Sequence, residues 1–91
     1  MDAGCVVYKY ALTEETTLEL PRGACPLSAG FQGHDVQLWV LVPIGQSVVK
    51  DQRRFRIAGT GEPLPLGGAQ YRYIGTAVWQ ERIVAHVFEV V

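Results

Sequence analysis

Short runs of β-branched and aromatic residues, separated by turns that carry glycine or proline, recur along the whole chain of 91 residues. No stretch is long enough and regular enough for a helix, and Pro63 and Pro65, two residues apart, exclude one in their neighbourhood. Strands spaced every 8–12 residues with turn signals between them are typical of a sandwich or small barrel. The pattern predicts an all-β fold, a small antiparallel sandwich or barrel of about seven short strands.

The length allows one small domain, residues 1–91, with a limited core. Hydrophobic residues make up 48% of the sequence, which is high for a soluble domain and argues against disorder. In a small domain of this composition some apolar residues remain at the surface, where a partner can cover them.

The first half of the chain is expected to form two hairpins. Residues 5–12 and 16–20 make the first, with Val6, Tyr8, Tyr10 and Leu12 facing inward. Residues 24–42 make the second, through a turn at 32–35. In that hairpin residues 24–31 are an irregular or edge strand, because Pro26 interrupts them. Residues 36–42 are apolar on both faces apart from Gln37, which predicts a central strand.

The stretch 50–63 is the dense basic cluster of the chain. Four of the eight basic residues lie in it, at Lys50, Arg53, Arg54 and Arg56. As a strand over 50–58 it points Phe55 and Arg53 to one face and the pair of Arg54 and Arg56 to the other. A turn at 59–61 and a surface loop at 62–70 follow.

Two further strands are expected at 71–79 and 82–91, joined by a turn at Gln80 and Glu81. Tyr71, Tyr73 and Trp79 are predicted to share a face. Gly75 marks a bulge or the close approach of another backbone.

The formal net charge of −1 gives no overall attraction to nucleic acid or to an anionic membrane, so nucleic acid is disfavoured as a partner. Cys5 and Cys25 are expected to be buried, reduced thiols. The acidic start of the chain does not resemble a signal peptide, and no apolar run is long enough for a membrane span. These features predict a cytoplasmic protein.

Catalysis is not expected. The two histidines, His34 and His86, are the available bases near neutral pH. We expect His34 to be solvated in a turn and His86 to be a satisfied core or interface residue. Glu62 and Glu89 are isolated, and no HExxH, CxxC or GxSxG motif occurs. We therefore predict no enzyme activity, no metal site and no cofactor.

Three binding hypotheses remain open. Gly59, Thr60 and Gly61 could cradle a phosphate beside Arg54 and Arg56, although the same residues also suit a tight turn next to solvated arginines. Exposed tyrosines could stack on bases. Arginine, tyrosine and tryptophan are also frequent anchors of protein interfaces, and the last strand could add to a partner's sheet or to a second copy in a homodimer.

The order of several short strings resembles a family of small proteins from phages and prophages of bacteria. The strings are Tyr8-Lys9-Tyr10, Phe55-Arg56-Ile57-Ala58-Gly59-Thr60-Gly61-Glu62-Pro63, Tyr73-Ile74-Gly75-Thr76 and His86-Val87-Phe88-Glu89. In that family a histidine often precedes the proline, where this chain has Glu62. The resemblance implies a phage origin and an accessory role, and it brings no activity with it.

Together these observations predict a non-enzymatic phage accessory protein that binds a host bacterial protein, such as a component of a defence system. The alternative is a small module that sequesters a nucleotide or another phosphate ligand. The residues expected to bind the partner or ligand are Lys50, Arg53, Arg54, Arg56, Gly59, Thr60, Gly61, Glu62, Tyr71, Tyr73 and His86.

Overall fold

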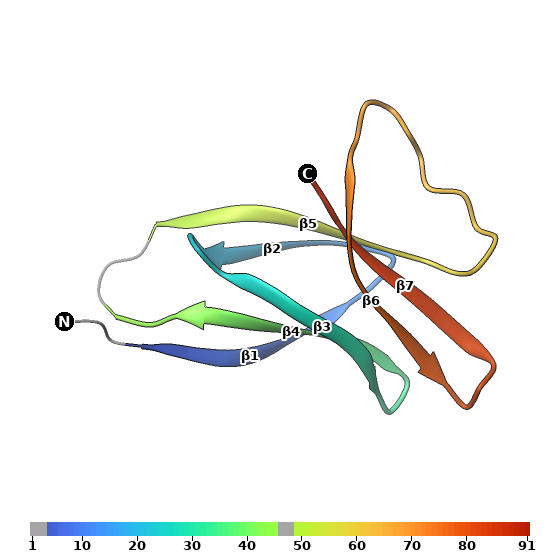
Figure 1. Ribbon diagram of the computed structural model, residues 1–91, viewed down its shortest axis with the longest axis horizontal. Coiled ribbons are helices and arrows are strands. Elements are labelled where there is room, and N and C mark those ends of the chain that lie inside the picture. Colours follow the sequence, from blue (N-terminus) through green and yellow to red (C-terminus); the bar gives the residue numbers. More distant parts are fainter. Residues whose placement is uncertain (1–3, 46–48) are drawn as a thin grey trace.

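The computed structural model describes residues 4–45 and 49–91 and confirms the all-β fold (Figure 1). Residues 1–3 and 46–48 lie outside the described part. The seven strands are β1 (Cys5–Leu12), β2 (Glu15–Pro21), β3 (Cys25–Gln32), β4 (Asp35–Pro43), β5 (Lys50–Ala58), β6 (Tyr71–Trp79) and β7 (Ile83–Val90).

The strands form two antiparallel sheets. A three-stranded sheet has the order β1-β4-β3, and a four-stranded sheet has the order β2-β5-β7-β6. The sheets approach one another most closely where β3 lies along β6, as Figure 1 shows. A Cβ built on Gly75 of β6 would lie 3.3 Å from the backbone nitrogen of Ala29 in β3. Glycine at this position allows the two backbones to approach closely.

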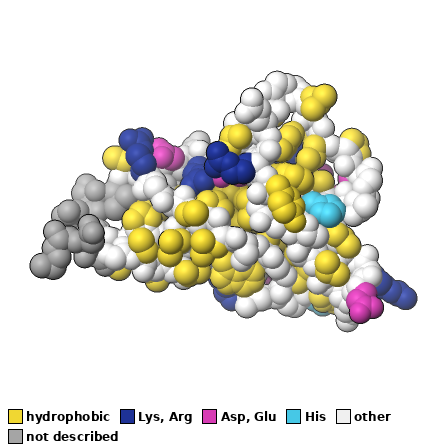
Figure 2. All heavy atoms as spheres, viewed as in Figure 1, with side chains coloured by type: hydrophobic (Ala, Val, Ile, Leu, Met, Phe, Trp, Pro, Cys, Tyr) yellow, Lys and Arg dark blue, Asp and Glu magenta, His cyan; other side chains and the backbone are white. Residues whose placement is uncertain are grey.

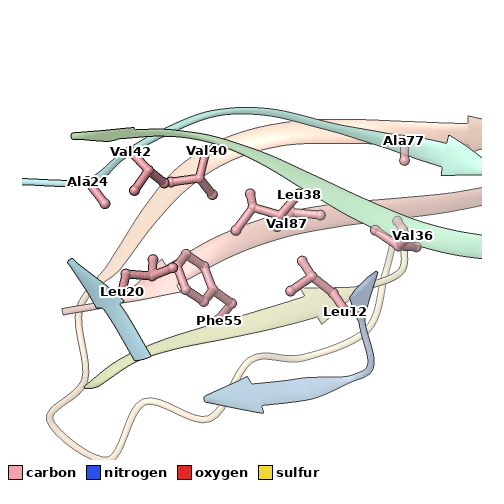
Figure 3. Close-up of a cluster of buried hydrophobic side chains, with 11 residues drawn as sticks. Leu12, Leu20, Ala24, Val36, Leu38, Val40, Val42, Phe55, Ala77 and Val87 are labelled. Carbon is pink, nitrogen blue, oxygen red and sulfur yellow. The ribbon is translucent and has the colours of Figure 1, made fainter. Parts of the chain in front are cut away.

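The core lies between the sheets, and alternate residues of the strands fill it (Figure 3). Its fully buried large side chains are Leu20, Leu38, Val40, Phe55 and Val87. Phe55 from the basic strand faces this core, so its two neighbours along the strand point to the opposite face of the sheet.

The predicted hairpin of residues 24–42, the turn that joins the last two strands and the predicted central strand are confirmed. β3 pairs with β4, β6 pairs with β7, and β4 lies in the middle of its sheet. The amide of Gln37 is buried on the outer side of that sheet. Lys9 and Gln32, on the strands flanking β4, hydrogen-bond to each other at 2.5 Å, and this bridge crosses β4 and shields it.

The predicted hairpin of residues 5–12 and 16–20 is wrong. β1 pairs with β4, whereas β2 pairs with β5 in the other sheet. The connection does not close a hairpin because it is bent by local hydrogen bonds. The backbone amide of Thr13 donates to the hydroxyl of Thr16 at 2.9 Å, and the hydroxyl oxygens of the two threonines are 3.2 Å apart. That local bend leads the chain from one sheet to the other, and β2 then places acidic and polar side chains next to the arginines of β5.

Two predictions about burial are also wrong. Cys5 and Cys25 are free and exposed rather than buried. Tyr8 lies on the core-facing side of β1, opposite the buried Val40, yet it is 51% exposed. β1 packs extensively only against β4, and Tyr8 lies outside the core against which Val6 and Tyr10 pack.

The prediction that Trp79 shares a face with Tyr71 and Tyr73 is wrong as well. The pairing of β6 with β7 shifts by one residue between Tyr73 and Gly75, and this is the bulge that the glycine suggested. A one-residue shift moves every later side chain to the other face. Trp79 consequently packs against His34 of the β3–β4 turn, with ring centroids 4.9 Å apart.

Candidate functional site

The outer side of the four-stranded sheet brings together five of the eleven predicted site residues, with Phe88 beside them. Facing away from the core, β5 presents Arg54 and Arg56, β7 presents His86 and Phe88, and β6 presents Tyr71 and Tyr73. We call these six residues the outer face. The register explains the grouping, because Phe88 lies opposite both Arg56 and Tyr73. In Figure 2 basic, hydrophobic and histidine side chains lie close together below the loop that follows β5.

Three aromatic rings form the centre of the outer face. The ring centroid of Phe88 lies 5.7 Å from that of Tyr73 and 6.1 Å from that of Tyr71, both in edge-on geometry. Tyr73 nevertheless remains 57% exposed. The hydroxyl of Tyr71 donates a hydrogen bond to the carbonyl of Pro65, which fastens the loop 59–70 to the edge of the sheet.

Arg56 is a largely buried cation with exposed counter-ions. Its side chain is 18% exposed, and it pairs with Glu15 at 2.9 Å and with Glu14 at 3.8 Å. These carboxylates are 74% and 78% exposed. The Nε of Arg56 is buried without a hydrogen-bond partner. The guanidinium is therefore held in place, whereas its counter-ions face solvent and are easily displaced.

Arg54 is exposed, and it has no salt bridge among the residues that the structure describes. It lies beside Arg56 at a pocket of about 270 Å³, which the loop encloses with Leu66 and which Tyr71 borders. A second pocket of about 230 Å³ lies on the other side of Arg56, between Glu14 and Pro63. Arg56 thus lines both pockets.

Arg53 does not belong to the outer face. It points inward, as predicted, and forms a two-point ion pair with Glu89 at 2.6 and 2.7 Å and a bond to the carbonyl of Ala24 at 2.6 Å. The carboxylate of Glu89 raises the pKa of the Arg53 guanidinium above its ordinary value. The interpretation of Glu89 as isolated is wrong, because its side chain is buried in this pair. The sequence signal was an acidic residue at a core-facing position of an apolar strand.

The corner at Gly59, Thr60 and Gly61 is already occupied by its own loop. The amide of Gly59 donates to a carboxylate oxygen of Glu62 at 2.5 Å, so that amide is not free for a phosphate. Gly61 has a φ of +87°, which other residues rarely adopt. These observations favour the interpretation of a tight turn over that of a phosphate cradle.

His86 joins this corner to the outer face. Its Nε2 lies 2.8 Å from the hydroxyl of Thr60, and its Nδ1 lies 3.0 Å from the hydroxyl of Thr76. The hydroxyl of Thr76 is in turn 2.5 Å from that of Tyr73. Both ring nitrogens are therefore satisfied, as predicted for a structural histidine, and the chain of bonds holds the loop against the sheet.

Lys50 stands apart from the other predicted residues. It is the first residue of β5, opposite Pro21 at the far end of β2. Arg54 lies four positions further along the extended strand, which is a distance of about 13 Å. Lys50 contributes no side chain to either pocket.

Neither a metal site nor a membrane helix is present in residues 4–45 and 49–91. No three metal-ligating side chains come together there, and no long apolar helix occurs.

The model of a family described as a domain of unknown function, DUF7352, matches residues 4–91. The chain belongs to the DUF7352 family. The match includes all seven strands and both pockets, so the outer face lies wholly within the DUF7352 domain. Searches of curated proteins and of solved structures found no match.

Proposed function

We propose that this protein is a non-enzymatic binding protein of phage origin that acts in the bacterial cytoplasm by holding a host protein, such as a component of a defence system. The phage origin rests on the sequence resemblance described above. The observation that carries the binding role is the outer face, where Tyr71 and Arg54, an arginine without a salt bridge in the described part of the chain, border a pocket and Tyr73 lies exposed beside them.

The composition of this face suits a protein partner. Arginine and tyrosine are frequent energetic anchors of protein interfaces, and a pocket beside them accepts a side chain of the partner. Tyr73 is 57% exposed and Leu66 is 78% exposed, so both offer apolar area to a partner without any rearrangement. The satisfied bonds of His86 and Tyr71 keep the face preformed, which lowers the entropic cost of binding.

The test compares face variants with a control in capture from a host extract. Arg54→Glu and Tyr73→Ala remove the two most accessible anchors of the face, whereas Ile83→Ala truncates a 50% exposed residue outside it. We expect the wild-type protein and Ile83→Ala to retain one host protein in stoichiometric amount, and the face variants to lose it. The complex is then rebuilt from purified partners. Equal capture by all four proteins contradicts the proposal.

A small phosphate ligand is the second candidate, and Arg56 favours it. Arg56 lines both pockets, and Arg54 lines the larger one beside it. Because the Glu15 carboxylate is exposed to solvent, its ion pair with Arg56 contributes only about 0–1 kcal/mol to the stability of the fold. A phosphate dianion, with more charge and more acceptor oxygens, can replace that carboxylate on Arg56.

Thermal unfolding with inorganic phosphate, pyrophosphate or ATP separates the two candidates. A ligand present at one hundred times its Kd stabilises the fold by about 2.7 kcal/mol. Under the second candidate Arg54→Glu abolishes this gain and Glu15→Gln increases it, because the competing carboxylate is removed. A protein-binding role predicts no gain with any of these anions.

A further inference from the structure

We infer that β1 is the dimerisation edge of this protein, and that a second copy of the chain adds its own β1 antiparallel to it. The product is a continuous six-stranded sheet in the order β3-β4-β1-β1-β4-β3. This inference is independent of the proposed function, because it concerns the other sheet.

The first observation is that β1 is an unprotected edge. Sheet edges expose unpaired backbone groups, and proteins usually guard them with proline, charge, bulges or a covering element. β2 ends at Pro21 and carries Glu15 and Glu19. β3 contains Pro26 and a bulge, β6 contains a bulge, and these two strands lie against each other.

β1 has only one of these devices, a single charged residue. Its pairing with β4 runs from Cys5 to Leu12 without a break, and it contains no proline. Its one charged residue, Lys9, is bonded to Gln32 across the face of its own sheet. Figure 1 shows β1 along the free margin of the molecule.

The second observation is that the core-facing side of β1 is only partly covered. Val6 and Tyr10 on that side pack against the core, whereas Tyr8 between them does not. Tyr8 is consequently 51% exposed. A strand added to the edge of β1 would place its own apolar side chains next to these three, as cross-strand neighbours do in any sheet.

The third observation is an excess of surface. A folded monomer of this mass exposes about 5,200 Å², whereas this chain exposes 6109 Å². Its radius of gyration is 14.0 Å, against about 12 Å for a compact domain of this length. The excess of roughly 900 Å² is close to the 800 Å² or so that each partner buries in a stable interface.

The sequence of β1 selects a second copy as the occupant. In antiparallel pairing centred on Tyr8, Tyr8 faces the second copy's Tyr8, Val6 faces Tyr10, and Val7 faces Lys9. This register sets aromatic and β-branched residues beside each other, which is favourable. It also keeps the two lysines from lying directly opposite one another. The net charge of −1 gives little repulsion between copies.

The test uses charges at the centre of the pairing. We expect the wild-type protein to sediment as a dimer, whereas Tyr8→Glu and Tyr8→Lys, each alone, sediment as monomers because like charges would face each other. An equimolar mixture of the two variants should recover a heterodimer. Tyr73→Glu, an equally exposed tyrosine on the other sheet, is the matched control and should remain dimeric.

A second measurement is independent of the charge variants. Tyr8→Cys in a background with Cys5→Ser and Cys25→Ser should oxidise rapidly to a symmetric disulfide-linked dimer, because the two residues face each other. Circular dichroism of every variant confirms that the fold is retained. A monomeric wild-type protein, a dimer that survives Tyr8→Glu, or a mixture that stays monomeric overturns the inference.

Discussion

Removing the charge of Glu89 should destabilise the fold severely, although this residue lies outside both pockets. Glu89→Gln keeps the shape of the side chain and leaves the guanidinium of Arg53 without its counter-ion. The Glu89 side chain is 5% exposed and that of Arg53 18% exposed, with an N–O distance of 2.6 Å. Breaking a buried ion pair from one side costs about 3–5 kcal/mol.

The lower end of that range applies here, because the Arg53 side chain is 18% exposed and water can partly solvate its guanidinium once the counter-ion is removed. A domain of this length has a total stability of roughly 5–14 kcal/mol. A loss of about 3 kcal/mol lowers the Tm by roughly 12–24 °C. Urea unfolding followed by tryptophan fluorescence, together with a thermal melt, measures both quantities.

Two controls make the argument specific to the buried charge. Replacing both partners, as Arg53→Met with Glu89→Leu, should cost only about 1 kcal/mol, the value of the lost bond to the Ala24 carbonyl. Asp51→Asn breaks the exposed pair with Arg22 and should change the free energy of unfolding far less than Glu89→Gln, because exposed ion pairs contribute little. If Glu89→Gln is as mild as Asp51→Asn, the pair is not a buried structural element and the reasoning fails.

Two further predictions concern an exposed carboxylate and a close backbone contact. The hydrogen bond from Arg22 lowers the pKa of Asp51 below its ordinary value of 3.8, so the stability that this pair adds is complete above pH 3.8 and is lost as the pH falls through the lower, folded pKa. An NMR titration should show this pKa returning upward in Arg22→Ala, and an unchanged value would contradict the pairing. Gly75→Ala should destabilise the fold by about 1–3 kcal/mol, because the new Cβ would lie 3.3 Å from the backbone of Ala29; a neutral effect in urea unfolding would show that the sheets can move apart.

Much of the fold follows from local alternation. The strands 5–12 and 71–79 were predicted with the bounds that they have, and β4 was predicted to be central because both of its faces are apolar. Which strands pair with one another was harder to predict from the sequence. A short polar turn such as that at Thr13 favours a hairpin, but hydrogen bonds within the turn send β2 to the other sheet. Sequence alternation gives a strand its faces and does not reveal which sheet the strand joins.

The candidate site was predicted in part, and the misses have physical causes. Arg54, Arg56, Tyr71 and Tyr73 share the outer face because alternation along single strands was enough to orient them. Trp79 does not, because a bulge reverses the phase of β6 and sequence periodicity assumes an unbroken ladder. Glu89 was missed because its partner comes from another strand, 36 positions away.

In the basic strand β5, adjacent arginines have different roles, one in stability and the next in binding. Arg53 and Arg54 are neighbours in sequence, yet the period of two sends one into a buried ion pair and the other to the rim of a pocket. A substitution at Arg53 therefore changes stability, and one at Arg54 changes binding with little change in stability. Arg56 lies between these cases, since it is largely buried but its counter-ions are exposed. Measuring Tm and partner affinity for the three arginine variants together would resolve these roles, because loss of affinity at an unchanged Tm is expected for Arg54 alone among the three.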